Sequence, residues 1–213
     1  MATYDLDEQE RLDELKAWWK RWGNLVLIGV AVVVAAAAGW RYWQHRTLTQ
    51  SLEAAAVYER LTQSLVANDV KGAREAGGLL IDQYQGTAYA PRAALVLARI
   101  NAASGDLKSA QAQLEWALAH AKEAALKDLA RLRLAGVQLD QKAYDAALKT
   151  LGGSHSDAFA ARFDDLRGDA LLAQGKVDEA RAAYQAAFGK LGEDNPYRSI
   201  VELKLDDLGG AAK

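Results

Sequence analysis

The 213-residue chain carries 26 basic and 28 acidic residues, which gives a formal net charge of −2, and it contains no cysteine. The balanced charge offers no basic stripe for a phosphate backbone, so we expect no nucleic-acid partner. The missing cysteines exclude disulfides, thiolate metal sites and a cysteine-linked lipid anchor, while two prolines among abundant Ala, Leu, Arg, Gln and Glu predict an all-α protein.

The first segment, residues 1–21, is a short charged tail, and residues 5–22 predict an amphipathic helix. Its large apolar residues share one helical face: Leu12, Leu15, Trp19 and Trp22. Acids crowd the start of this helix and bases its end, as the helix dipole favours. Two interpretations stay open: a helix that lies on the inner membrane surface, or a peptide that docks on a cytoplasmic protein.

The second segment is an apolar run from Trp22 to Trp40 without a charged residue, closed by Arg21 and Arg41. As a helix, these 19 residues span roughly 28 Å, about the hydrocarbon thickness of a bilayer. We therefore predict a transmembrane helix over residues 22–43. The alternative is a buried helix of a soluble core, although such helices usually carry a polar face.

Aromatic residues cluster at the two ends of the apolar run. Indole and phenol rings favour the headgroup layer, so two clusters one bilayer apart mark the two interfaces and predict contact with membrane lipid. The predicted membrane-interface residues are Trp18, Trp19, Trp22, Trp40, Tyr42 and Trp43.

Flanking charges predict the direction of the span. Four bases precede it within residues 1–22, against Arg41, Arg46 and the more distant Arg60 after it, which favours a cytoplasmic N-terminus. The bulk of the chain then lies across the membrane, in the periplasm of a bacterial cell. A cleaved signal peptide with a small-residue site in Ala35–Ala38 is the competing interpretation, but the long acidic region before the run argues against it.

The third segment, residues 44–213, repeats itself. The helix continues to about Val66 and ends at Asn68-Asp69, and similar stretches then start at Gly105, Lys142 and Gly175, spaced 37 and 33 residues apart, with a degenerate copy at Asn68. This is the period of tetratricopeptide repeats. The predicted fold is an all-α chain with one N-terminal transmembrane helix and a tetratricopeptide-like α-solenoid. Pro196 starts a C-terminal capping helix through Leu208.

The repeat pattern is steric. Small residues let helices approach closely, a large residue fills the remaining hole, and glycine lets the second helix fold back. The predicted packing residues are Gly105, Ala110, Leu114, Ala117, Ala147, Leu151, Gly168, Leu171, Gly175, Ala180, Tyr184 and Ala187.

Little in the sequence points to catalysis. His45, His120 and His155 lie far apart without metal-ligand spacing, so no metal or other cofactor is expected. The acidic cluster Asp157–Asp169 fits an exposed helical face, although a membrane-tethered enzyme using these carboxylates stays a weaker hypothesis. Solenoids bind through the concave face of their first helices, where the register places Arg92, Arg99, Arg162, Asp165 and Asp169 as groove candidates. Ordinary solvated charges are the alternative.

Three stretches carry a specific likeness: Gly39-Trp40-Arg41-Tyr42-Trp43, Ala146–Leu151 and Leu166–Leu172 followed by Gly175. With the charged tail and the span, they resemble the YfgM family of Gram-negative bacteria over nearly the whole chain. The resemblance implies an inner-membrane, non-enzymatic subunit that accompanies the SecYEG translocon and a periplasmic chaperone of the PpiD type.

The resemblance also implies a link between the cytoplasmic tail and a stress-response regulator, although the tail is the part of the chain that departs most from the family. The alternative function is a tetratricopeptide adaptor of another cell-envelope assembly, in division or outer-membrane biogenesis.

Overall fold

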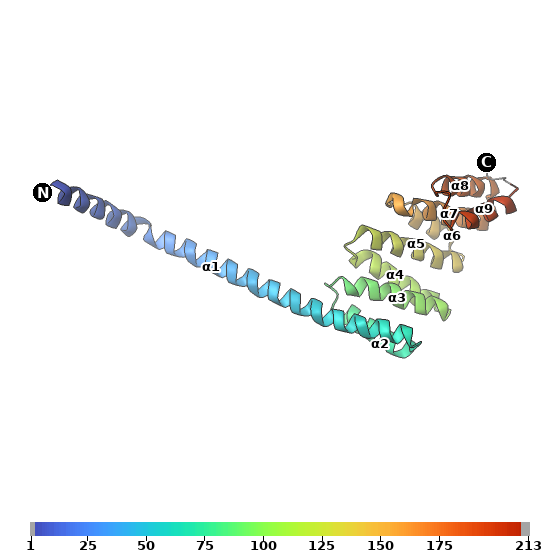
Figure 1. The fold of residues 1–213 in the computed structure, drawn as a ribbon, viewed down its shortest axis with the longest axis horizontal. Helices are drawn as coiled ribbons and strands as arrows, with labels where there is room; N and C mark the ends of the chain where they lie inside the picture. Colours follow the sequence, from blue (N-terminus) through green and yellow to red (C-terminus); the bar gives the residue numbers. More distant parts are fainter. Residues whose placement is uncertain (1–2, 210–213) are drawn as a thin grey trace. The chain divides into compact units, whose positions relative to one another are not determined.

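A computed structural model describes the backbone of residues 3–209 and the side chains of residues 10–209. The acidic start of the tail and the last four residues, which belong to the predicted tail and repeat segments, lie outside the described side chains. In the described part of the chain, the regular structure is helical throughout (Figure 1). The helices are α1 Thr3–Val66, α2 Val70–Gln83, α3 Tyr89–Ala103, α4 Leu107–His120, α5 Ala124–Asp140, α6 Tyr144–Leu151, α7 Asp157–Ala173, α8 Val177–Gly189 and α9 Arg198–Asp207.

The chain divides into two compact units, residues 1–50 and residues 51–213. The first consists of most of α1, so the tail, the apolar run and its continuation form one unbroken helix. Only 6% of the most apolar 18-residue window of this helix is buried. This exposure does not fit the alternative of a buried core helix, and the length and composition of the helix fit a membrane span.

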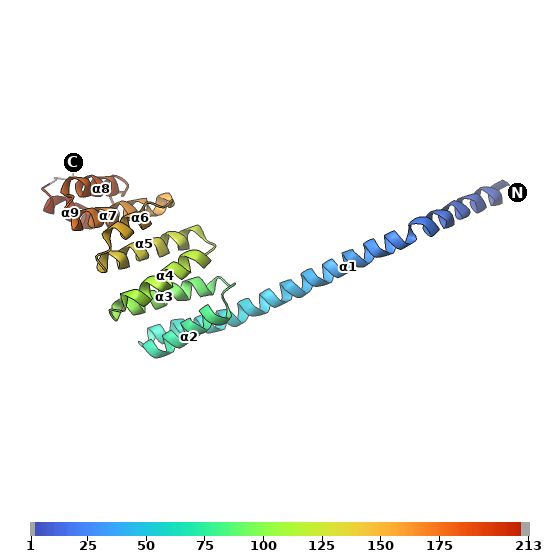
Figure 2. The same ribbon diagram turned by 180° about the vertical axis from the view of Figure 1, so that it is seen from behind.

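The second unit is an array of helical hairpins, seen from both sides in Figures 1 and 2. The last turns of α1 and then α3, α5 and α7 are the first helices of the hairpins (A helices), and α2, α4, α6 and α8 are the second (B helices). Each helix from α2 onward packs on its neighbours in sequence, and α3 packs on α5 and α5 on α7. This is the predicted tetratricopeptide-like solenoid.

One turn geometry joins every hairpin. Asn68, Gly105, Lys142 and Gly175 all adopt left-handed backbone conformations, with φ of 55°, 81°, 61° and 77°. Each lies two residues after its A helix and two before its B helix. The next residue donates its N–H back across the turn, as Asp106 does to the carbonyl of Asn101 at 2.9 Å. This is the Schellman closure of a helix C-terminus, and it occurs at each predicted repeat start.

The hairpins are held by small residues facing large ones. In the last hairpin, Gly168 of α7 touches the ring of Tyr184 of α8 so closely that an added Cβ would lie 2.4 Å from Cε1. Around this contact, Leu171, Ala180 and Ala187 bury their side chains with Tyr184 and with Val201 of α9. The middle hairpins repeat the scheme with Ala110, Leu114 and Ala117, and with Ala147 and Leu151, all buried.

Candidate functional site

The acidic cluster of α7 does not lie on an exposed helical face, and that prediction is wrong for Asp164 and Asp165, which are buried. Asp164 is buried and pairs with Arg167 at 3.0 Å and with Lys190. Among the described residues, no group of three or more His, Asp or Glu side chains could hold a metal ion. The Asp164 carboxylate is therefore held by two cations of the chain itself.

Asp165 and Asp169, two of the predicted groove residues, lie at the contact between α7 and the C-terminal helix α9. Lys204 of α9 places its Nζ 2.8 Å from Asp165 and 2.7 Å from Asp169. Tyr184 donates its hydroxyl to Asp169 at 2.7 Å, and Tyr197 donates to Asp165. Both carboxylates are therefore engaged by the chain's own side chains.

The same cluster perturbs its tyrosines. Burial, and then the hydrogen bond donated to an aspartate, raise the pKa of Tyr184 and of Tyr197 well above the usual tyrosine value. Arg162, a third predicted groove residue, is exposed and lies over the Tyr197 ring, with Cζ 3.7 Å from the ring centroid. A cation over an aromatic face is a favourable contact, so Arg162 also belongs to the surroundings of α9.

Arg92, the groove candidate in the first turn of α3, forms a bridge to the next repeat. Its guanidinium binds both carboxylate oxygens of Glu123, at 2.8 and 2.9 Å, and donates to the carbonyl of Ala88. Both bonds to Glu123 come from Nη2, while Nη1 donates to Ala88, and hydrogen bonds between ionised groups are stronger than those between neutral groups. The structure thus gives Arg92 a partner at the junction between α3 and α5.

Arg99, the fifth candidate, is exposed and lines a groove between α3 and α5 of about 280 Å³. We call this the α3–α5 groove. Arg99 and Arg133 supply its basic side chains, and Ala98, Ala102, Leu114 and Val137 supply an apolar floor. Arg133 was missed from the sequence. Arg133 lies 34 residues after Arg99, whereas the turns at Gly105 and Lys142 are 37 residues apart, so the repeat pattern gave no signal for it.

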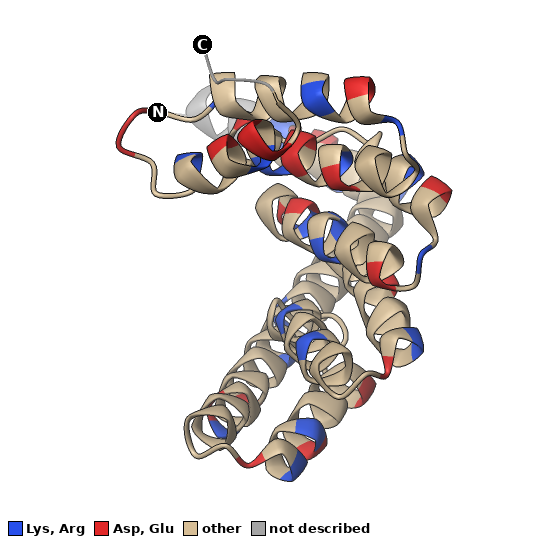
Figure 3. Ribbon diagram, turned by 90° about the vertical axis from the view of Figure 1, so that its right-hand side faces the viewer, with Lys and Arg blue, Asp and Glu red and all other residues tan. Residues whose placement is uncertain are grey.

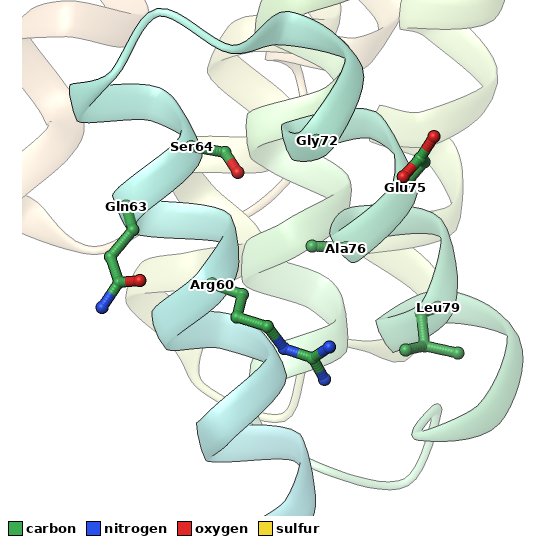
Figure 4. A pocket seen from close by; sticks show the side chains of 7 residues that line it. All are labelled: Arg60, Gln63, Ser64, Gly72, Glu75, Ala76 and Leu79. Atoms are coloured by element: carbon green, nitrogen blue, oxygen red, sulfur yellow. The ribbon is translucent and has the colours of Figure 1, made fainter.

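Charge elsewhere on the array is mixed. Basic and acidic residues are interspersed over the stacked hairpins (Figure 3). A larger groove of about 420 Å³ lies between the end of α1 and α2. Figure 4 shows Arg60 extending from α1 toward α2, with the Ser64 hydroxyl pointing toward Gly72. Glu75 lies on the far side of α2 and pairs with Lys71 at 3.8 Å. The polar groups of this groove therefore do not converge on one point.

The predicted interface aromatics lie exposed along α1. Their exposed fractions run from 46% for Trp22 to 69% for Tyr42. Trp18 and Trp19 have ring centroids 6.3 Å apart, and Trp40 and Trp43 have centroids 5.4 Å apart. All six rings are thus exposed, as contact with the headgroup layer would require.

Comparison with known proteins covers the chain almost completely. A family model described as a tetratricopeptide repeat-like domain matches residues 16–210. A protein of Escherichia coli (strain K12) named ancillary SecYEG translocon subunit is 32% identical over 209 residues, which is 98% of this chain and 99% of the relative.

Two further relatives carry the same name. The protein of Haemophilus influenzae is 31% identical over 206 residues, 97% of this chain and 100% of its own length. The protein of Neisseria gonorrhoeae is 31% identical over 209 residues, 98% of this chain and 100% of its own length. The similarity therefore extends over the apolar run as well as the repeats.

Proposed function

Because this chain belongs to the YfgM family of ancillary SecYEG translocon subunits, we propose that it is a non-enzymatic, membrane-anchored scaffold that associates with the Sec translocon. One observation carries the proposal: relatives named for this association match the chain from the charged tail through the last helix. The long exposed apolar helix and the helical array are the two parts that such a scaffold needs, an anchor and a binding surface.

We place the N-terminus in the cytoplasm and the array in the periplasm, with the span in the bacterial inner membrane. The surplus of bases before the apolar run supports this direction. The chain lacks cysteine, so single introduced cysteines report the direction cleanly. A membrane-impermeant maleimide should label Lys176→Cys in cells with a permeabilised outer membrane and Glu10→Cys only after lysis. The reverse labelling pattern would contradict the proposed orientation.

In the periplasm, the array would hold a chaperone of the PpiD type or a polypeptide leaving the translocon. The exposed Arg99 and the groove that it lines between α3 and α5 support binding by the array. On the cytoplasmic side, the amphipathic tail would lie on the lipid surface or dock a stress-response regulator. Lys16 and Asp13 pair on its exposed surface at 3.0 Å, which leaves the tail's apolar face free for either contact.

The test is recovery of partners from the membrane. The full chain is extracted in mild detergent after crosslinking, beside a control whose residues 22–40 are replaced by an unrelated transmembrane segment of equal length. We expect SecYEG and a membrane-anchored chaperone with the full chain. Recovery of division or outer-membrane assembly proteins in their place would support the alternative adaptor function, and recovery of neither group would contradict the scaffold.

A further inference from the structure

The α3–α5 groove contains two guanidinium groups that the described chain leaves without a carboxylate partner. Arg133 donates to the carbonyl of Leu95 at 3.3 Å, and no ion pair joins Arg99 or Arg133 to any described acid. Asp140 lines the same groove but pairs with neither arginine. By contrast, Arg92, Arg131 and Arg167 all bind a carboxylate within the array.

The two arginines act on each other. Partial burial, and then the positive charge of Arg99, lower the pKa of Arg133 from its usual value. An anion placed between them would replace this repulsion by attraction. Guanidinium groups match carboxylates best, because their planar donors fit the two carboxylate oxygens.

The floor of the groove adds a second requirement. Ala98, Leu114 and Val137 are buried apolar residues that face the same space of about 280 Å³. Such a floor favours an apolar side chain over water. A ligand that satisfies both features carries a carboxylate and a large apolar side chain close together.

We infer that the α3–α5 groove binds a segment of unfolded polypeptide that combines an acidic residue with a large apolar one. The carboxylate would lie between Arg99 and Arg133, and the apolar side chain on the alanine, leucine and valine floor. The inference deepens the proposed function and rests on it in one respect, namely that the bound segment is taken to come from a chain leaving the translocon.

Gly136 makes the inference testable without damage to the fold. It lies in α5 and lines the groove, and a Cβ added there would meet no atom within 4 Å. Gly136→Leu therefore starts its side chain in open space beside the groove, and leucine is a better helix former than glycine by about 1 kcal/mol. Gly78 of α2 also has open space above it and lies outside the groove, so Gly78→Leu is the matched control.

The experiment measures fluorescence polarisation of a labelled peptide with the full-length protein in detergent micelles. The probe is a fluorescein-labelled peptide with Leu, Phe and Asp spaced by Gly and Ser, beside a version with Asn in place of every Asp. We expect the Asp peptide to bind at least about tenfold more tightly than the Asn peptide at low salt. Gly136→Leu and Arg99→Glu should each weaken binding by about tenfold or more, while Gly78→Leu and Lys176→Glu leave it unchanged.

Several outcomes would overturn the inference. Equal binding of the Asp and Asn peptides, or full binding by both Gly136→Leu and Arg99→Glu, would show that the groove is not the acidic-peptide site. Binding of vesicles rich in anionic lipid, reduced by Arg99→Glu, together with no binding of the Asp peptide, would assign the groove to a lipid headgroup instead. These results are separate from the recovery of SecYEG. If SecYEG copurifies while the Asp peptide fails to bind, only the groove assignment is wrong. If the Asp peptide binds while SecYEG does not copurify, the groove assignment holds and the association with the translocon is wrong.

Discussion

The middle and the C-terminal end of the array place opposite charges at the same repeat position. Arg99 lies six residues before the left-handed turn at Gly105, and Asp169 lies six residues before the turn at Gly175. Arg99 faces an open groove, whereas Asp169 is held by Lys204 and Tyr184. The repeat position therefore determines the direction of the side chain. The helix that follows the hairpin, α5 for Arg99 and α9 for Asp169, determines whether that side chain is covered.

The covering residues are equivalent as well. Lys204 lies five residues before the left-handed Gly209, and Val137 lies five residues before the left-handed Lys142. The apolar Val137 forms part of the floor beside Arg99, while Lys204 neutralises Asp165 and Asp169. Val137 therefore leaves the charge of Arg99 uncovered, whereas Lys204 covers the charge of Asp169 at the equivalent position.

The largest expected effect on stability comes from the tight contact between Gly168 and Tyr184. This contact supports the C-terminal end of the array, where Lys204 covers the aspartates of α7 and which we call the closed end. In Gly168→Leu, the new side chain would overlap the buried Tyr184 ring, which has no space to move. We expect the free energy of unfolding to fall by about 3 kcal/mol or more, as in overpacked cores. Urea unfolding followed by helical circular dichroism measures this loss. Gly136→Ala, at an open helical glycine of the middle repeat, should have no such cost, and equal losses in both variants would refute the steric explanation.

The next largest effect follows loss of the covering ammonium group. Lys204→Met removes the cation from Asp165, which is buried, and from Asp169, which is partly exposed. Removing one partner of a buried ion pair typically costs about 3–5 kcal/mol, and we expect a smaller loss here because Tyr197 still donates to Asp165. Adding Asp165→Asn and Asp169→Asn to Lys204→Met should restore part of the stability in the same urea measurement. If these additions destabilise further, the penalty does not come from unpaired charge.

A third, pH-dependent effect should appear at the closed end. The pKa of Tyr184 and of Tyr197 is higher in the folded than in the unfolded state. Their contribution to stability is therefore complete below the unfolded value of about 10 and is lost as the pH rises above it toward the folded pKa. Urea unfolding between about pH 8 and pH 11 should show falling stability. The slope should be shallower in Tyr197→Phe, and an unchanged slope would mean that this tyrosine titrates normally.

The smallest effect is expected when the acid–cation pair of the C-terminal end is introduced into the α3–α5 groove. Arg99→Asp with Val137→Lys places the acid and the cation of the closed end at the equivalent positions of the middle repeats. A double-mutant cycle should show favourable coupling of about 0.5–1 kcal/mol, because position 99 is exposed and the charges would meet in an open groove. Coupling that is absent at low salt would show that the two positions do not face each other as their counterparts do.

The features that local residues determine could be predicted from the sequence. The four repeat starts have left-handed turns at their predicted positions, including Lys142, where no glycine signals the turn. The apolar run is helical and exposed, as predicted. Its length and composition were enough for that prediction, because they do not depend on how the rest of the chain folds. Charge partners could not be predicted in this way. The contacts of Asp165 and Asp169 with Lys204 join residues 39 and 35 positions apart, and they depend on how α9 packs rather than on the period of the repeat.

The uniform turn between hairpins has an evolutionary consequence. Asn68, Gly105 and Lys142 are separated by equal steps of 37 residues, and each repeats the same backbone closure. A duplication or deletion of one such step joins a turn to an identical turn, and the remaining hairpins keep their nearest neighbours. Unequal recombination within the gene could therefore lengthen or shorten the array by whole units, so that descendants vary in reach while every surviving joint keeps its geometry.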